Sequence, residues 1–221
     1  MIRRRLGQLF MGMVGGMLIG SASHAMGQDL NCLIQPHVVV TITTPVGGLV
    51  ETIQVDRGDL VKEGQILATL DTSLERASGA VQHAQAELTN RRLADLELQR
   101  TTAEVALRTV KSPINGVVTE RFMHPGEFTK QEKILKLAQI DPLRVEVYAP
   151  VALLNKVTVG TTAYVKPESP LTGEYSAKVT VVDRVVDAAS GTFGVRLEMP
   201  NRDLKMPAGL KCTVRFGKIK E

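Results

Sequence analysis

One segment of this sequence occurs twice, and the duplication limits the folds open to the chain. Residues 45–67 read PVGGLVETIQVDRGDLVKEGQIL and residues 113–135 read PINGVVTERFMHPGEFTKQEKIL, so residue n of the first copy corresponds to residue n + 68 of the second. Self-similarity at a fixed offset indicates one structural unit used twice. The copies are identical at Pro45/Pro113, Gly48/Gly116, Val50/Val118, Gly58/Gly126, Lys62/Lys130, Ile66/Ile134 and Leu67/Leu135.

Each copy has the pattern of short β-strands separated by tight turns. Apolar and polar residues alternate near a period of two, which favours strands. The dipeptides Arg57-Gly58 and Pro125-Gly126 hold equivalent positions. Proline fixes φ at the first central position of a turn, and glycine accepts a positive φ at the second, so we expect a type II turn in the second copy. The predicted structural turns are at Gly48, Gly58, Gly116 and Gly126.

Two such units packed face to face would form a flattened barrel with pseudo-two-fold symmetry, because neither is long enough to bury its own apolar face. The arrangement, over residues 38–71 and 112–141, resembles the biotinyl/lipoyl domain, which is built from two such halves. In carrier members of that family, a lysine on a hairpin between the halves bears the prosthetic group. Here no lysine occurs from Thr72 to Val110. We therefore expect no carrier role and no cofactor.

The residues between the copies have a helical period. Apolar residues recur at alternating spacings of three and four, which indicates heptad seams. Asp71, Thr72 or Ser73 can cap the first helix, and Pro113 ends the second helical region. The predicted seams are Leu74, Ala77, Val81, Ala84 and Leu88 in the first arm, and Leu93, Leu96, Arg100, Ala103, Leu107 and Val110 in the second.

Geometry favours a helical hairpin over residues 72–111. A single helix of this length would separate the two flanking strands by ~58 Å, although both belong to one small barrel. Two antiparallel arms of about 15 residues return the chain to its start and project ~22 Å. We expect the seams to pack against each other within the hairpin. Thr89-Asn90 lies between them and forms the tip.

A third module begins near residue 142 and extends to residue 217. Five segments have strand character, and the intervening turns contain Gly160, Gly173, Gly191 and Gly209. Short strands at this spacing predict a small antiparallel β-barrel. The segments are LRVEVYA, TAYVK, EYSAKVTVVDRVV, TFGVRLEM and LKCTVRF, and VALLNK is a possible short helix. The predicted fold is thus mainly β with an inserted α-helical hairpin.

Residues 1–25 have the pattern of a secretory signal peptide: three arginines, an apolar run, then small residues. The apolar run of about 15 residues is short for a ~20-residue membrane span. We expect cleavage and a periplasmic protein, with an uncleaved inner-membrane anchor as the alternative. Loss of Arg3, Arg4 and Arg5 lowers the formal charge from +4 to +1. No basic stripe remains, so nucleic-acid binding is not expected.

The chain has two cysteines, Cys32 and Cys212. Disulfides persist in the compartments that exported proteins reach. Cys32 precedes the first predicted strand and Cys212 lies in the last, so the two are neighbours if the chain enters and leaves through one module. We predict a Cys32–Cys212 disulfide; the alternative is two buried free thiols.

The order of the modules resembles that of the HlyD-like membrane fusion proteins, or periplasmic adaptors. The resemblance covers residues 38–216 and rests on GGLVETIQVDRGDLVKEGQILATLD, SPINGVVTERFMHPGEF and VDAASGTFGVRLEMPNRDLKMPAGLKCTV. It implies a non-catalytic protein that assembles as a homo-oligomeric ring. It also implies two partners, an inner-membrane transporter and an outer-membrane channel, in an efflux or secretion system.

The resemblance further implies that the hairpin tip binds the channel through an Arg, a Leu four residues later and a Ser seven after that. Arg92 and Leu96 match, but Ala103 replaces the serine. The candidate tip residues are Thr89, Asn90, Arg91, Arg92 and Leu96. Two departures are expected: the hairpin is short for the family, and no membrane-proximal domain is apparent at either end.

Other functions have little support in the sequence. A hydrolase is not indicated, because there is no G-x-S-x-G motif and the four histidines are scattered. Met199 and Met206 have no partner at ligand spacing, so no metal site is predicted. The remaining alternative is a periplasmic scaffold or binding module that holds a membrane sensor or an envelope enzyme.

Overall fold

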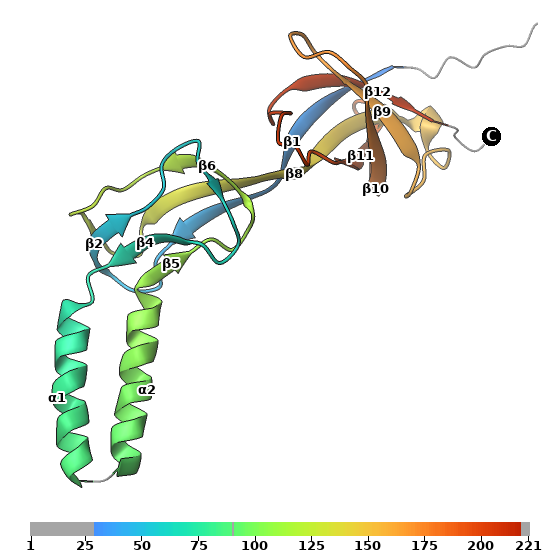
Figure 1. The fold of residues 1–221 in the computed structure, drawn as a ribbon. Coiled ribbons are helices and arrows are strands. Elements are labelled where there is room, and N and C mark those ends of the chain that lie inside the picture. Colours follow the sequence, from blue (N-terminus) through green and yellow to red (C-terminus); the bar gives the residue numbers. More distant parts are fainter. Residues whose placement is uncertain (1–28, 90, 218–221) are drawn as a thin grey trace, which may run out of the picture.

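The computed structural model describes residues 29–89 and 91–217 and arranges them as three units in a row (Figure 1). A helical hairpin stands at one end, a small β unit lies in the middle, and a β-barrel occupies the other end. The hairpin consists of α1 (Ser73–Thr89) and α2 (Arg91–Leu107). The chain is thus mainly β with one helical insertion.

The middle unit is built from two four-stranded sheets of equivalent order. One has the order β1-β8-β6-β3 and the other β5-β4-β2-β7. Each strand of one sheet corresponds to a strand of the other sheet that lies 68 residues away in the sequence. The strands are β1 (Leu30–Thr43), β2 (Gly48–Ile53), β3 (Leu60–Val61), β4 (Ile66–Leu70), β5 (Thr109–Lys111), β6 (Gly116–Arg121), β7 (Phe128–Thr129) and β8 (Lys133–Pro150).

Reciprocal backbone hydrogen bonds lock the two copies together. The Gly58 N–H donates to the Val118 carbonyl at 2.8 Å, and the equivalent Gly126 N–H donates to the Val50 carbonyl, also at 2.8 Å. The short strands are exchanged between the copies in the same way. β3 of the first copy pairs with β6 of the second, and β7 of the second copy pairs with β2 of the first in the equivalent register. Each copy therefore completes its sheet with a strand of the other, and neither closes without its counterpart.

The interior of this unit is aliphatic. Its fully buried side chains come from both copies and include Leu67, Leu70, Ile134, Leu135 and Leu137. Val110 also belongs to this core, because residues 109–111 form β5 and pair with β4. The expectation that the second helix continues to residue 111 was therefore wrong: the strand ladder takes these residues, and α2 ends at Leu107.

The predicted turns divide into two kinds. Gly58 and Gly126 have φ of +95° and +89° and lie at the third position of hydrogen-bonded turns, as expected. Gly48 and Gly116 instead begin strands β2 and β6, so their assignment as turns was wrong. Gly116 allows a close backbone approach, because a Cβ there would overlap the carbonyl of Ala138, whereas a Cβ at Gly48 would meet the side chains of Arg108 and Leu70.

We predict that Gly116→Ala destabilises the protein by roughly 1–3 kcal/mol, because the new methyl group meets a backbone carbonyl that cannot move aside. The matched control is Gly48→Ala, whose methyl group would lie 2.7 Å from the flexible Arg108 Nη1. Urea unfolding of the two variants measures the difference. Equal losses of unfolding free energy would contradict this account of Gly116.

The far unit is a closed antiparallel barrel. Its strands follow the order β1-β12-β9-β10-β11-β8, and pairing of β8 with β1 closes it. The five predicted strands are confirmed as the second half of β8, β9 (Thr162–Pro167), β10 (Tyr175–Asp187), β11 (Thr192–Met199) and β12 (Lys211–Phe216), with a 3-10 turn at Val151–Leu153. The sixth strand, the first half of β1, was not predicted.

A two-stranded ribbon joins the barrel to the middle unit. β1 and β8 pass from one unit into the other without interruption (Figure 1). The buried side chain of Asn201 stabilises the point where the ribbon enters the barrel. Its Nδ2 donates hydrogen bonds to the carbonyls of Ile140 and Met206, each at 2.9 Å. The Asn201 backbone N–H also donates to the carboxylate of Asp141. The barrel loop is thereby fastened to the ribbon.

Cys32 and Cys212 form the expected disulfide. They are direct partners in the pairing of β1 with β12. Cys32 lies inside β1 rather than before the first strand, because β1 begins at Leu30. The bond joins the first and last strands across 180 residues of sequence.

We predict that Cys32→Ala/Cys212→Ala lowers the unfolding free energy by about 2–4 kcal/mol, since the bond restricts a long loop of the unfolded chain. Reduction of the unaltered protein should produce the same loss in a thermal or urea melt. A melting transition that does not respond to reduction would contradict this role.

Among residues 29–89 and 91–217, we find no helix of the length and hydrophobicity needed to cross a membrane.

Candidate partner-binding surfaces

The hairpin is fastened to the middle unit at Asp71. The Asp71 carboxylate accepts hydrogen bonds from the Ser73 backbone N–H at 2.8 Å and from the Ser73 hydroxyl at 3.1 Å. These bonds hold the pKa of Asp71 below its ordinary value of 3.8, and the charge of Arg108 acts in the same direction. Arg108 also donates from Nη1 to the Asp71 carbonyl at 3.0 Å. The end of α2 is thus tied to the start of α1.

The two helices do not pack through the predicted apolar seams. Leu74 and Val81 of α1 are 74% and 58% exposed, and Leu93, Leu96 and Leu107 of α2 are exposed as well. The facing side chains are small or polar instead: Gly79 contacts Thr101, where a Cβ on the glycine would overlap the threonine side chain. Ala86 and Ala94 are buried nearer the tip. The expected packing face was therefore wrong.

The seam that does form contains little apolar surface. Thr101 donates its hydroxyl to the Glu97 carbonyl in the preceding turn of α2. Glu97 Oε2 is buried and has no hydrogen-bond partner within the part of the chain that the structure describes. A helix in a protein is stabilised mainly by tertiary packing of its apolar face. This hairpin leaves that face on its outside.

The predicted tip residues lie at the far end of the hairpin from the barrel (Figure 1). Thr89 ends α1 and Arg91 begins α2, while Asn90 lies outside the described residues. Arg91, Arg92 and Leu96 are exposed. Ala103, two turns beyond Leu96, is also exposed. The pattern of an Arg, a Leu and a small residue therefore follows one outward face of α2.

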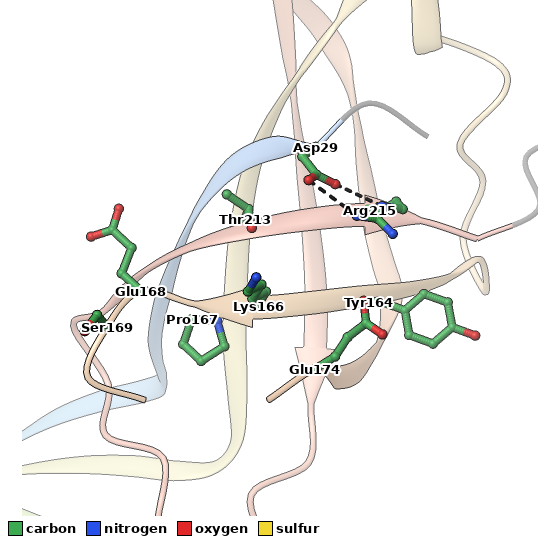
Figure 2. A pocket seen from close by; sticks show the side chains of 9 residues that line it. All are labelled: Asp29, Tyr164, Lys166, Pro167, Glu168, Ser169, Glu174, Thr213 and Arg215. Atoms are coloured by element: carbon green, nitrogen blue, oxygen red, sulfur yellow. Dashed lines mark hydrogen bonds and ion pairs between the residues drawn. The ribbon is translucent and has the colours of Figure 1, made fainter. Parts of the chain in front are cut away.

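A second candidate surface lies on the barrel, at the opposite end of the molecule. A pocket of about 350 Å³ lies over the paired strands β9 and β12, and Figure 2 shows the side chains that line it. Arg215 pairs with Asp29 at 2.9 Å, which raises the pKa of Arg215 above its usual value. Lys166, Glu168 and Glu174 add charges of both signs. Sequence reasoning missed this surface, because Asp29 and Arg215 are 186 residues apart.

Within the described residues, there is no group of three or more His, Cys, Asp or Glu side chains that could hold a metal ion. Both surfaces present exposed charged or apolar side chains that can contact another macromolecule.

We predict that Asp71→Ala lowers the melting temperature of the hairpin at neutral pH. The pKa of Asp71 is lowered in the folded state, so its stabilising effect is present above its ordinary pKa and is lost as the pH falls through the lower folded value. The difference from the unaltered protein should therefore shrink in acid. Circular dichroism melts at several pH values measure it.

The matched control is Asp95→Ala, which removes an exposed carboxylate of α2 away from the hairpin base. Its melting temperature should stay close to that of the unaltered protein. A loss for Asp71→Ala that persists unchanged in acid would contradict the assigned role.

Comparison with known proteins agrees with this architecture. A model of the CzcB-like barrel-sandwich hybrid domain matches residues 38–139, and a model of the CusB-like β-barrel domain matches residues 143–220. An uncharacterized protein of Haemophilus influenzae is 21% identical over 214 residues. That match spans 83% of this chain and 56% of the relative, so the chain covers little more than half of that protein's length.

Two solved structures share the fold. MacA from Actinobacillus actinomycetemcomitans has a TM-score of 0.69 at 17% identity, with 88% of this chain and 79% of that chain covered. The membrane fusion protein Spr0693 from Streptococcus pneumoniae R6 has a TM-score of 0.68 at 14% identity, with 87% and 99% covered. Since the two domain models together span most of the sequence, in the order in which the middle unit and the barrel occur, the chain belongs to the proteins that join a CzcB-like barrel-sandwich hybrid domain to a CusB-like β-barrel domain, and it shares the fold of membrane fusion proteins.

Proposed function

We propose that this protein is the periplasmic adaptor subunit of a multi-component efflux or secretion system. In this role it links an inner-membrane transporter to an outer-membrane channel, carries out no chemical reaction, and acts by assembly and docking. The observation that carries the proposal is the separation of the two candidate surfaces. The far end of the hairpin and the strands β9 and β12 lie at opposite ends of one elongated molecule (Figure 1), and the charged pocket is lined by residues of those two strands.

The proposed assembly is a ring of copies with all hairpins pointing the same way. The exposed apolar side chains of α1 and α2 support self-association, because contiguous apolar surface on a soluble protein marks an interaction site. The tip residues Arg91, Arg92 and Leu96 would face the channel. The charged barrel end would face the transporter, where a rim of both signs gives orientation rather than affinity.

Site-specific photocrosslinking in cells tests the two ends separately. A photoreactive residue in place of Arg91 should yield products with an outer-membrane channel protein, identified by mass spectrometry. The matched variant carries the same residue in place of Lys166 at the barrel pocket, and it should yield an inner-membrane transporter. Products from Arg91 that contain only an inner-membrane sensor or an envelope enzyme would contradict the adaptor role.

One observation favours a second candidate function, a scaffold that holds a sensor or an enzyme at the membrane. Each helix has 17 residues, so the hairpin projects only roughly 25 Å. A scaffold needs no greater reach than this. The same crosslinking experiment separates the two functions, because the scaffold predicts no outer-membrane product.

A further inference from the structure

A hollow of about 480 Å³ lies where the middle unit meets the barrel. Its volume falls within the range of ~300–1,000 Å³ that is typical of small-molecule sites. The ribbon strand β8 lines it with Ile140. Both units contribute walls: Leu60 and Lys62 come from the end of β3, and Arg202 and Leu204 come from the barrel loop that follows β11.

Each wall presents one leucine and one cation, two residues apart in the sequence. Leu60 is 59% exposed and Leu204 is 37% exposed. Lys62 and Arg202 are exposed as well, and neither forms an ion pair with another residue in the part of the chain that the structure describes. The hollow therefore combines an apolar surface with cations whose charges are not neutralised by ion pairing.

The charges of the lining favour an anion. Asp141 is the acidic residue among those that line the hollow, and its carboxylate accepts a hydrogen bond from the Asn201 backbone N–H at 2.9 Å. The two cations, Lys62 and Arg202, leave an excess of positive charge. A partly enclosed site with an excess of one sign of charge attracts ligands of the opposite sign.

Hydrogen bonds fix both walls. Strand β3 pairs with β6, and just beyond it the Glu63 N–H donates to Asn115 Oδ1 at 3.0 Å. In the barrel loop, the Leu204 N–H donates to the Asn201 carbonyl at 2.8 Å, and Asn201 Oδ1 accepts the Met206 N–H at 3.1 Å. Walls that are already in place reduce the entropy that a ligand loses on binding.

Leu204 also has an unusual backbone conformation. Its φ is +54°, a left-handed value that is uncommon for residues other than glycine. Such conformations cost free energy and cluster at ligand-binding and active sites. Here the conformation holds an apolar side chain on the wall of the hollow, partly in water, where an apolar ligand would cover it.

We propose that this hollow binds a small anionic amphiphile, a molecule with an apolar chain and a single carboxylate, as in a fatty acid. The leucines of both walls contact the chain, and Lys62 and Arg202 pair with the carboxylate. Because the ligand contacts both units, its binding favours the orientation of the barrel seen in Figure 1. The site does not depend on the adaptor role proposed above.

A fluorescent reporter can be placed in the hollow, because the chain contains no tryptophan. The reporter variant is Leu60→Trp, and the matched control is Phe128→Trp. Residues 60 and 128 are equivalent in the repeat, and their side chains are 59% and 60% exposed. Phe128, however, belongs to β7 in the other sheet. Its presence there indicates that this strand position accepts an aromatic side chain.

The probe is ω-bromoundecanoate, whose terminal bromine quenches tryptophan only on close contact. Used below its micelle concentration, it should quench Leu60→Trp saturably and leave Phe128→Trp nearly unchanged. Titration calorimetry of the unaltered chain should give the same dissociation constant. Equal quenching of the two tryptophans would mean nonspecific partitioning and would overturn the site, as would the absence of quenching in both.

Charge substitutions in the Leu60→Trp background test the anionic class. Lys62→Gln/Arg202→Gln should weaken binding of the carboxylate by at least roughly fivefold, since two ion pairs are lost. The matched control is Lys130→Gln, at the repeat-equivalent position of the second copy, which should leave binding unchanged. The neutral ω-bromoundecanol should bind more weakly and should not respond to the double substitution. An alcohol that binds as tightly as the carboxylate would overturn the class of ligand.

A second copy of the chain is the other occupant that would cover Leu60. We expect the emission maximum of Leu60→Trp, measured without the probe, to stay constant as the protein concentration rises. A shift to shorter wavelength with concentration would overturn the proposal in favour of an interface between copies.

Discussion

The structure depends on the exchange of backbone hydrogen bonds between the two copies of the repeat. Gly58 bonds to the strand of the second copy at Val118, and Gly126 bonds to that of the first at Val50. In the closed unit the end of β4 lies beside the start of β5, because Thr69 and Thr109 are partners in an antiparallel pairing. The helical insertion must then leave and return at one point, which makes it a hairpin. The projecting arm is therefore a consequence of how the repeat closes.

A second consequence concerns where the apolar surface of the hairpin goes. The base is fixed by Asp71 and Arg108, and the close contact of Gly79 with Thr101 sets the rotation of both helices. With that rotation, small and polar residues fill the seam and the leucines face outward. The hairpin of a single copy is then incomplete as a packing unit. The assembly proposed above would cover the leucines and complete this packing.

Much of the fold could be predicted from the sequence, because the repeat and the switch from period two to heptad spacing are local patterns. The five barrel strands and the turns at Gly58 and Gly126 followed from such patterns, and the disulfide followed from export and the terminal positions of its cysteines. The first half of β1 was missed because its partner β12 lies at the other end of the chain. The seam was misplaced because apolar spacing locates a stripe but not the side it packs on. The close contact of Gly79 with Thr101 determines which side of each helix packs in the seam, and that contact is visible only in three dimensions.

The most direct test of the whole account is electron cryomicroscopy of the protein purified from cell envelopes with its bound partners. We expect a ring of copies with parallel hairpins, in contact with a channel at the hairpin tips and with a membrane transporter at the barrel end. A single copy bound to a sensor or an enzyme, with the exposed leucines of the hairpin covered by that partner, would contradict the account.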